Sequence, residues 1–360
     1  VLSSGPVIVS RSSMGAPRGI EYWHRKAPSR IVQTQKRIGK PRTDTFWANG
    51  KRGTRTGMLV GCCPSYCDLT QMEEACYTAN MPELPEVETV VRLLLPDVEG
   101  RVVTGIVVHR DELRRSIGLA RWAPHVLNQT ILGTRRRAKW PALVFPSGCL
   151  WMHLGMTGQI QMFEGTREVG PHDHLDLVLD NGRTLRYFDP RRFGIVDWTA
   201  GQTSEPPSST LGPEPLTQDF TAQAFHTALK KSSKAIKVVL MDGKAVVGVG
   251  NIYASEALFR AKIHPDAPAK ALTLAQATTL HKAVVDVLTQ AVNNGGSTLR
   301  DYRKPDGTKG DAQSYHFVYD RAHQPCLVCK STIKTATHAG RATYWCAKCQ
   351  PWKAAYVLTE

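Results

Sequence analysis

The sequence predicts an α+β protein of several domains: a helix with a β-sandwich, then a helical domain, then a small zinc module with four cysteines. Three observations carry this prediction. One helical apolar pattern is followed by many short β-prone segments, which Gly or Pro separates. Patterns of helical period come next. Two Cys-x-x-Cys pairs lie close to the carboxyl end.

The first regular pattern begins just after Met81. Apolar residues recur there at the spacing of one helix face, namely Val87, Val90, Val91 and Leu94. Pro96 is expected to end this helix, because proline removes a backbone hydrogen-bond donor.

Short strands are expected after the helix, at 102–108, 142–145, 150–154 and 159–163. Leucine alternates with other residues over 175–180, and the dipeptide Asn181-Gly182 is typical of hairpin turns. We therefore expect a hairpin that continues into a strand at 184–188. This many short strands favours a β-sandwich.

The chain then changes from strands to helices. Residues 201–215 are dense in Ser and Pro, as is typical of a linker. Helices are expected at 220–230, 235–241, 251–261 and 280–292. Gly295 and Gly296 are expected to end the last of them.

These patterns divide the chain into five parts. The expected parts are an upstream extension at 1–80, a β-sandwich domain at 81–200, a linker at 201–215, a helical domain at 216–320, and a zinc finger with a tail at 321–360. The extension shows no sustained period of 2 or 3.6, so it is interpreted as disordered or untranslated. A basic DNA-binding tail or an organelle-targeting segment are the alternatives.

Charge points to the class of partner. The net charge is +15 and the isoelectric point is near 9.5, which favours phosphate polyanions. The hydrophobic content of 42% and charged content of 21% are typical of a soluble globular protein. The sequence contains no run of about 18 apolar residues, so no membrane span is predicted. No secretory signal is recognised at the start.

The most specific pattern is a metal site. Cys326 and Cys329 form one Cys-x-x-Cys pair, and Cys346 and Cys349 form another, with sixteen residues between the two pairs. Four thiolates at this spacing can surround one Zn²⁺ tetrahedrally, with a short hairpin between the pairs. A closed shell of four sulfurs leaves no open position, so we expect structural zinc and not catalytic zinc.

Pro82 and Glu83 carry chemistry if Pro82 is the amino end of the protein. A free proline amine can attack the C1′ carbon of a sugar and form an iminium ion, and the neighbouring carboxyl is suited to proton transfer. The same residues are also an ordinary helix start, since proline favours the first turn and glutamate favours the positive end of the helix dipole.

The chain resembles the bacterial formamidopyrimidine-DNA glycosylases, the Fpg/MutM branch of the Fpg/Nei family, over about residues 81–350. Besides the start MPELPEVET and the four-cysteine tail, the blocks found in the family's order are 136–139 (RRAK), 153–158 (HLGMTG), 172–176 (HDHLD), 189–194 (DPRRFG), 211–215 (LGPEP) and 246–256.

By this resemblance, three residues are catalytic. Pro82 is the nucleophile, Glu83 is the proton donor and acceptor at the sugar, and Lys139 is the lysine near the phosphate and sugar of the damaged nucleotide. Glu86 helps to order the amino-terminal turn. Without the resemblance, Lys139 is one cation beside three arginines on a strand exposed to solvent.

The resemblance also implies DNA contacts. Met156, Arg191 and Phe193 match a trio that fills the space left by an everted base, although Met156 and Phe193 could equally be core residues. His172, Arg191, Asn251 and Arg341 are implied DNA-binding residues. Asn251 opens a helix–two-turn–helix motif, where it could also be a plain N-cap, and residues 296–319 contain the lesion-recognition loop.

The implied activity is base-excision repair of double-stranded DNA. A monomer with one structural Zn²⁺, in the bacterial cytoplasm and associated with nucleoid DNA, is expected to remove 8-oxoguanine and formamidopyrimidines through a Pro82 imine, followed by β,δ-elimination. Two alternatives stay open: a glycosylase for oxidised pyrimidines of the endonuclease VIII type, and a damaged-DNA binder without catalysis.

The position of Pro82 decides between enzyme and binder. An internal proline nitrogen is an amide and cannot form the imine. We therefore expect the functional chain to begin at Met81 and to lose that methionine.

Overall fold

The first described helix leads directly into a β-sandwich in this computed structural model, which describes residues 7–10, 22–24, 81–201, 203, 205–207, 210–296 and 316–356. Helix α2 (Leu84–Val98) buries Val87 and the other apolar residues of its predicted face. The predicted end at Pro96 is wrong, because the helix includes Pro96. Proline removes one backbone donor, and the burial of Val98 in the core keeps the last turn in place.

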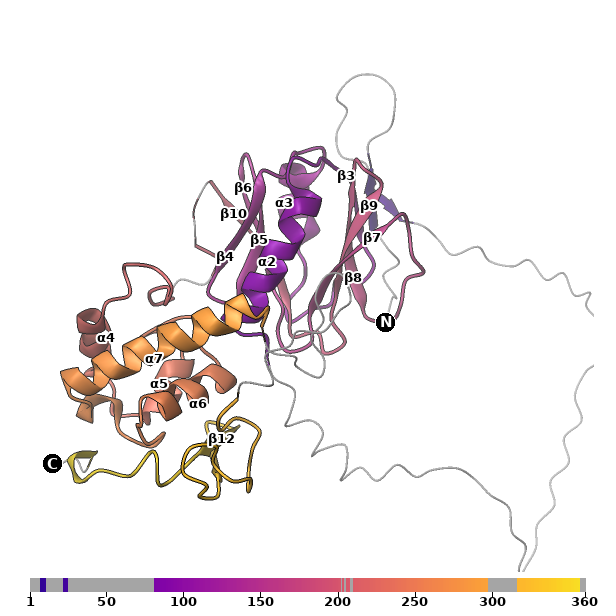
Figure 1. Cartoon of the computed structure of the whole chain (residues 1–360). Coiled ribbons are helices and arrows are strands. Elements are labelled where there is room, and N and C mark those ends of the chain that lie inside the picture. The colour runs from indigo at the N-terminus through magenta and orange to yellow at the C-terminus, as the bar shows by residue number, and fades with distance from the viewer. Residues whose placement is uncertain are drawn as a thin grey trace, which may run out of the picture. The chain divides into compact units, whose positions relative to one another are not determined.

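The sandwich consists of two antiparallel sheets. The larger sheet has the order β2–β1–β3–β8–β9–β7, with β1 (Val7–Ser10), β2 (Tyr22–His24), β3 (Val103–Val108), β7 (Gln159–Glu164), β8 (Asp173–Leu179) and β9 (Arg183–Phe188). The smaller sheet has the order β10–β6–β5–β4, with β4 (Gly133–Arg137), β5 (Trp140–Phe145), β6 (Gly148–His153) and β10 (Ile195–Ala200). Figure 1 shows the two sheets facing each other.

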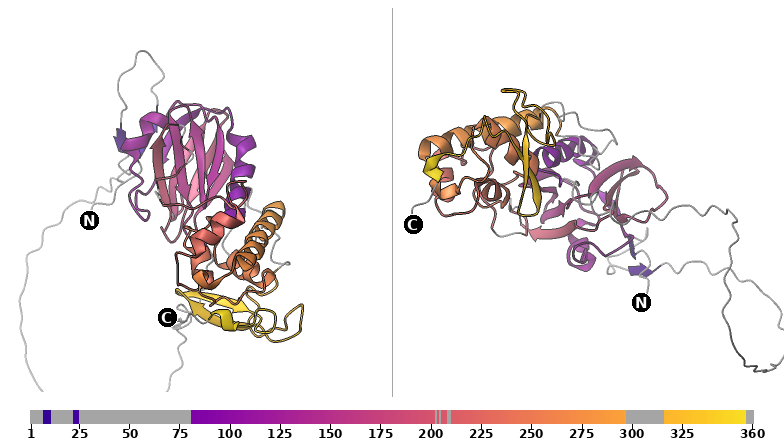
Figure 2. Two further views of the ribbon diagram at one scale, coloured as in Figure 1. Left: turned by 90° about the vertical axis from the view of Figure 1, so that its left-hand side faces the viewer. Right: turned by 90° about the horizontal axis from the view of Figure 1, so that it is seen from below.

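Two helices pack at opposite edges of the smaller sheet. Helix α2 contacts β4 and β5, and α3 (Leu119–Val126) contacts β10 on the opposite edge. The left-hand view of Figure 2 shows these two helices, in purple, at opposite edges of the sheets. The apolar side chains between these elements form the core, which includes Leu143, Leu150 and Tyr187.

The segment 1–80 was expected to lack regular structure. The two strands described within it, β1 and β2, pair with each other, and β1 also pairs with β3. The rest of that segment lies outside the described residues. By their contacts, residues 1–25 and 78–360 group into one unit.

Helices dominate after the linker. They are α4 (Ala222–Leu229), α5 (Ile236–Met241), α6 (Asn251–Arg260), the short 3₁₀ helix η1 (Ala269–Ala271) and α7 (Leu274–Asn293). Thr221 caps α4, and a capping box between Thr273 and Gln276 begins α7. Helix α7 packs on α4, α6 and α2, which places the amino end of α2 beside the helical domain.

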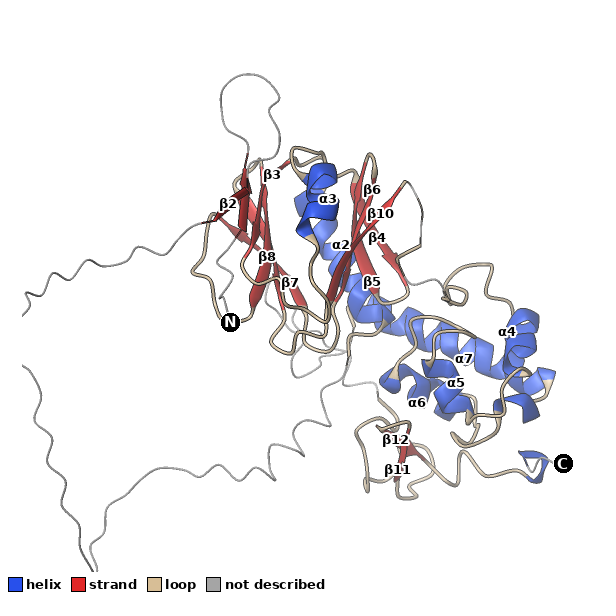
Figure 3. Cartoon of the chain, turned by 180° about the vertical axis from the view of Figure 1, so that it is seen from behind, coloured by secondary structure: helices blue, strands red, loops and turns tan. Residues whose placement is uncertain are grey.

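The carboxyl-terminal module is a two-stranded hairpin followed by one short 3₁₀ helix. Its elements are β11 (Lys334–His338), β12 (Arg341–Trp345) and η3 (Ala354–Tyr356). Figure 3 separates the strands of the sandwich and of this hairpin from the helices between them. Among the described residues, no helix is long and apolar enough to cross a membrane.

Candidate active site and nucleic-acid interface

The amino end of α2 is held in place by backbone contacts. The Glu83 N–H donates to Glu86 Oε2 (2.9 Å), and the Leu84 N–H donates to the carbonyl of Gly248 (3.0 Å). Pro82 is buried next to these contacts. The two residues predicted to be catalytic therefore lie in an ordered segment that contacts the helical domain.

The Glu83 carboxylate lies at the amino end of α6. Its Oε2 accepts the N–H of Gly250 (2.6 Å), and its Oε1 accepts the N–H of Ile252 (2.8 Å). Burial raises the pKa of Glu83 to about 7, while the positive charge of Lys139 opposes the rise. A carboxyl with a pKa near neutrality can both give and take a proton at ordinary pH.

Two glycines make room for this arrangement. A Cβ on Gly250 would lie 2.4 Å from the Glu83 carboxyl carbon, and a Cβ on Gly248 would lie 2.6 Å from Leu84. Gly248 also has a φ of +79°, which favours glycine. The glycine-rich turn before α6 is thus shaped to receive the amino end of α2.

Glu86 and Tyr253 add a second connection between the same two helices. The Tyr253 hydroxyl donates to Glu86 Oε1 (2.7 Å). Both residues are buried. Glu86 therefore helps to order the amino-terminal turn, as the resemblance implies.

Lys139 is not the solvent-exposed cation of the alternative interpretation. It is half-buried in the turn between β4 and β5, and its Nζ donates to the carbonyl of Val249 (3.2 Å). Burial lowers the pKa of Lys139; the negative charge of Glu83 opposes this effect, and Arg341 adds to it. Glu83 and Arg341 therefore both lie within electrostatic range of Lys139.

The three residues predicted to fill the void come from two neighbouring loops. A Cβ on Gly155 would lie 2.6 Å from the backbone of Phe193, so the loop of Met156 contacts the loop of Arg191 and Phe193. The Arg191 guanidinium lies 4.9 Å above the centre of the Phe193 ring. Phe193 is 43% exposed, so it is not the core residue of the alternative interpretation.

Asp189 holds these two loops together. It is fully buried and accepts hydrogen bonds from the Thr157 hydroxyl (2.6 Å) and the Gly194 N–H (2.8 Å). Asp189 begins the motif at 189–194, but the local sequence gave no sign of this role.

Three of the implied DNA-binding residues lie in different parts of the structure. His172 is half-buried, with its ring edge-on to Phe188. Asn251 is the first residue of α6, with Gly250 as N-cap, so it is not the N-cap itself. The Asn251 Oδ1 is buried and has no hydrogen-bond partner among the described residues. Arg341 is exposed at the start of β12.

The lesion-recognition loop expected within 296–319 lies mostly outside the described residues, which resume at His316. There, the buried carboxylate of Glu256 accepts the N–H groups of Phe317 (2.9 Å), Val318 (2.9 Å) and Tyr319 (2.8 Å). Helix α6 thus holds Glu83 at one end and this segment further along.

The four cysteines lie together, as predicted. Their sulfurs are all within 4.8 Å of one another, and Cys326 and Cys346 are buried. Four thiols grouped in this way fit a tetrahedral Zn²⁺, which needs no other ligand. The sulfurs pack beside Val318 and Ile333, so the metal site is continuous with a small core.

A buried lysine that was not among the predicted site residues connects this finger to the helical domain. Lys237 on α5 is fully buried, and its Nζ donates to the Thr343 hydroxyl (2.7 Å) and the Ala342 carbonyl (2.9 Å). Burial lowers its pKa to about 7, Glu83 opposes this effect, and Arg341 adds to it. A charged residue in the apolar run 236–241 was the available signal.

Three family models match the chain in the order of its domains. They are the formamidopyrimidine-DNA glycosylase N-terminal domain at residues 81–196, the H2TH domain of the same enzymes at 211–303, and the zinc finger found in FPG and IleRS at 324–351. The formamidopyrimidine-DNA glycosylase of Escherichia coli O6:H1 is 43% identical over 270 residues, which is 75% of this chain and all of that protein.

Solved structures are similar to this one. The MutM (Fpg) protein of Thermus thermophilus is 41% identical with a TM-score of 0.67, over 75% of this chain and 98% of that one. The Lactococcus lactis Fpg bound to DNA containing an abasic site is 32% identical with a TM-score of 0.70, over 75% of this chain and all of that one. A complex of the same protein with DNA containing N7-benzyl-Fapy-dG is 31% identical, with the same score and coverage.

A sandwich whose leading helix reaches an H2TH domain, followed by a four-cysteine finger, defines a zinc-finger DNA glycosylase. The chain belongs to the formamidopyrimidine-DNA glycosylase family. The predicted fold class, family and zinc module are thereby confirmed.

Proposed function

We propose that this chain removes oxidised purines, 8-oxoguanine and formamidopyrimidines, from double-stranded DNA and then cleaves the strand at the abasic site. The observation that carries the proposal is the buried Glu83 carboxyl beside Pro82 at the amino end of α6, with Lys139 in electrostatic range. The L. lactis structures with Fapy-dG and abasic-site DNA support this choice of substrate.

The reaction begins with the free amine of Pro82. Its lone pair forms a bond to C1′ of the damaged nucleotide, and the bond between C1′ and the base breaks. Glu83, with a pKa of about 7, transfers protons at the sugar so that it opens and an iminium ion forms. The electron pair of the broken bond leaves with the base, which takes up a proton.

Strand cleavage follows from the iminium ion. Loss of a proton from C2′ expels the 3′ phosphate, and a second elimination expels the 5′ phosphate. Water then hydrolyses the remaining imine and restores the Pro82 amine. Lys139 binds the adjacent phosphate, and Asn251, His172, Arg191 and Arg341 hold the flanking backbone.

The everted base leaves a gap in the duplex. Met156, Arg191 and Phe193, whose loops are in contact, enter this gap and replace lost stacking and pairing. One Zn²⁺ bound by the four cysteines stabilises the finger that carries Arg341. The protein acts as a monomer on DNA in the bacterial cytoplasm.

The test compares two forms of the protein on a duplex with one 8-oxoguanine. The first begins at Pro82, and the second is the full chain from Val1. Borohydride should trap a covalent adduct on Pro82 of the first form only, because the second has an amide there. Pro82→Gly should weaken trapping, and Glu83→Gln should block base removal. An adduct on a lysine would contradict the proposal, and a preference for thymine glycol would favour the endonuclease VIII-like alternative.

A further inference from the structure

The turn that carries Lys139 has an unfavourable backbone conformation. Strands β4 and β5 are joined by only two residues, Ala138 and Lys139. Ala138 has a φ of +54°. This left-handed region favours glycine, because the Cβ of an L-residue crowds its own backbone there. The direction of Lys139 therefore depends on whatever keeps Ala138 in this conformation.

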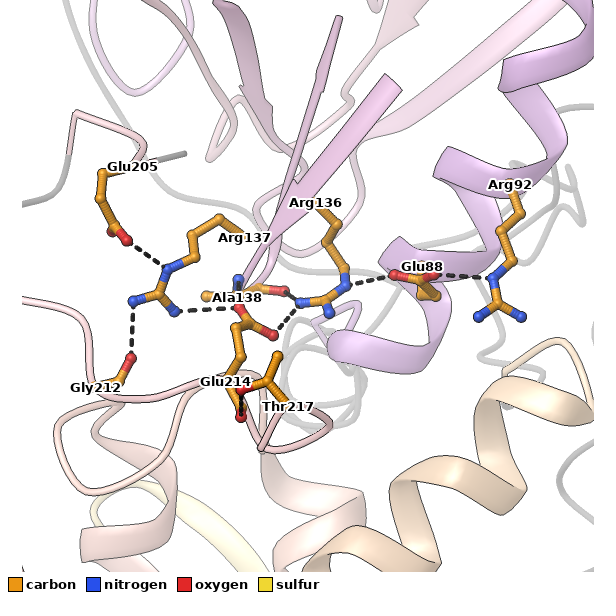
Figure 4. Close-up of polar contacts among 9 residues, drawn as sticks. All are labelled: Glu88, Arg92, Arg136, Arg137, Ala138, Glu205, Gly212, Glu214 and Thr217. Carbon is orange, nitrogen blue, oxygen red and sulfur yellow. Dashed lines mark hydrogen bonds and ion pairs between the residues drawn. The ribbon is translucent and has the colours of Figure 1, made fainter. Parts of the chain in front are cut away.

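Glu214 and Arg136 hold both polar backbone groups of Ala138. Glu214 Oε1 accepts the Ala138 N–H (2.6 Å), and Arg136 Nη1 donates to the Ala138 carbonyl (3.1 Å). The same Arg136 nitrogen donates to Glu214 Oε2 (2.7 Å). Figure 4 shows these three residues as one connected group. An ion pair thus encloses a single strained residue.

The ion pair is itself held in place from several elements. Arg137 donates to Glu214 Oε1 (3.1 Å) and to the Gly212 carbonyl (2.8 Å). Arg136 also donates to Glu88 on α2 (2.7 Å), and the side chains of Arg136 and Glu214 are only 11% and 14% exposed. Glu214 thereby connects the linker, β4 and the helix that begins beside Glu83.

The two-residue turn between β4 and β5 determines where the Lys139 ammonium lies. Its Nζ reaches the carbonyl of Val249, the residue just before Gly250. Gly250 donates to the Glu83 carboxylate. A change in the direction of this short turn therefore moves the Lys139 charge relative to Glu83.

We propose that Glu214 is a positioning residue of the active site, which keeps Ala138 in its left-handed conformation and so directs Lys139 toward Glu83. This inference rests on the proposed function. Glu214 touches no reacting atom and acts through Lys139 alone. The other reading is that Glu214 merely stabilises the joint between domains, and a double-mutant cycle separates the two.

The cycle combines Glu214→Ala with Lys139→Met in the protein that begins at Pro82. A displaced catalytic group can lower a rate by up to about a hundredfold. Glu214→Ala should lower the rate of base removal at saturating DNA by roughly tenfold to a hundredfold, with KM nearly unchanged. In the Lys139→Met background, the same change should cost less than about twofold, because the residue it positions is gone.

Two further measurements identify the cause of the loss. Ala138→Gly should restore most of the activity of Glu214→Ala, since glycine adopts a positive φ without strain. The Lys139 charge opposes the rise in the pKa of Glu83, so displacing or removing this charge should raise that pKa further. Glu214→Ala should therefore shift the fall of activity to a higher pH, as Lys139→Met does. Glu214→Gln keeps an oxygen for the Ala138 N–H and should lie between Glu214→Ala and the parent.

Glu205→Ala is the matched control. Glu205 also pairs with Arg137, but it is 51% exposed and has no hydrogen bond to Ala138. Its activity should stay within about twofold of the parent. Two outcomes in an active parent protein would overturn the positioning role. One is an equal loss of the rate of base removal in Glu205→Ala and Glu214→Ala. The other is a loss from Glu214→Ala that is as large in the Lys139→Met background as in the parent. A parent that forms no borohydride adduct would overturn the proposed function as well. If Glu214→Ala does not fold, Glu214→Gln takes its place in the cycle.

Discussion

The carboxylate of Glu83 lies 2.6 Å from the backbone nitrogen of Gly250, a residue 167 positions further along the chain. Glu83 precedes the first helix of the sandwich domain, and Gly250 is the N-cap of α6 in the helical domain. The proposed proton-transfer group is therefore held by backbone amides of another domain, and changes on either side of this contact should affect activity.

Gly250→Ala should abolish base removal. The new Cβ would lie 2.4 Å from the Glu83 carboxyl carbon, so the carboxylate must leave the amino end of α6. Overpacking of this kind costs roughly 1–3 kcal/mol of stability, and we expect a rate loss of about a hundredfold or more. Thermal unfolding and single-turnover kinetics measure the two effects. Gly170→Ala, where the Cβ would meet nothing closer than 3.5 Å, is the control and should change neither.

Base removal should slow as the pH rises through about 7. Burial holds the pKa of Glu83 near that value, so the folded protein keeps a protonated carboxyl available below it and loses this donor above it. The check is the pH dependence of single-turnover excision. A fall centred near the ordinary glutamate pKa of 4.5 would mean that burial does not raise the pKa of Glu83 in the working enzyme.

Removal of zinc should unfold the finger and weaken DNA binding. Zinc binding contributes on the order of 10 kcal/mol in small structural sites, and the finger holds both Arg341 and the oxygen atoms that accept from Lys237. Cys346→Ala should lose the metal, as measured by elemental analysis. Cys149→Ala, which changes a buried cysteine of the sandwich, should retain it. Full affinity in a zinc-free protein would contradict the structural role.

Binding should weaken steeply with salt. Each phosphate contact contributes a slope of roughly −0.9 to the logarithm of affinity against the logarithm of salt concentration. Arg341→Ala removes one exposed charge and should make the slope shallower by roughly the contribution of one phosphate contact. The change should be equal for damaged and undamaged duplexes. Fluorescence anisotropy over a range of salt concentrations measures this. An unchanged slope would remove Arg341 from the interface.

Lys237→Met should flatten the dependence of stability on pH. Burial lowers the pKa of Lys237 to about 7 in the folded protein, whereas the unfolded chain keeps its proton up to the ordinary lysine value of 10.5. Between these two values the unfolded state binds more protons, so the free energy of unfolding rises with pH, by at most about 1.4 kcal/mol per pH unit. Denaturation of the parent and of Lys237→Met at pH 7 and pH 9 isolates this effect. If the free energy of unfolding changes equally in the two proteins between these pH values, Lys237 does not titrate there.

Local patterns predicted most of the sandwich and the helices, because alternation and helical spacing are properties of neighbouring residues. They missed β4, whose sequence Gly-Thr-Arg-Arg-Arg has no apolar alternation. This strand is stabilised by ion pairs between its arginines and residues distant in the sequence, namely Glu88 and Glu214. Helix α3 and strand β10 were missed as well.

The site divides in the same way. The four cysteines stand in a short motif whose chemistry can be inferred from the residues themselves, whereas Pro82 and Glu83 could also be an ordinary helix start, and their predicted roles came from the family resemblance. Lys237 and Glu214 gave no comparable signal, because their roles arise from Thr343 and Ala138, residues that only the folded chain brings to them. A contact over more than 70 positions leaves no trace in the local sequence.

The contact between Glu83 and α6 has a consequence for the order of synthesis. Pro82 and Glu83 leave the ribosome long before residues 250–253, whose amides hold the carboxylate. A nascent chain with only the sandwich exposed therefore has Glu83 without these amide partners. On the proposed mechanism, such a chain would have the nucleophile but no ordered proton donor, and reaction with DNA would wait for the helical domain.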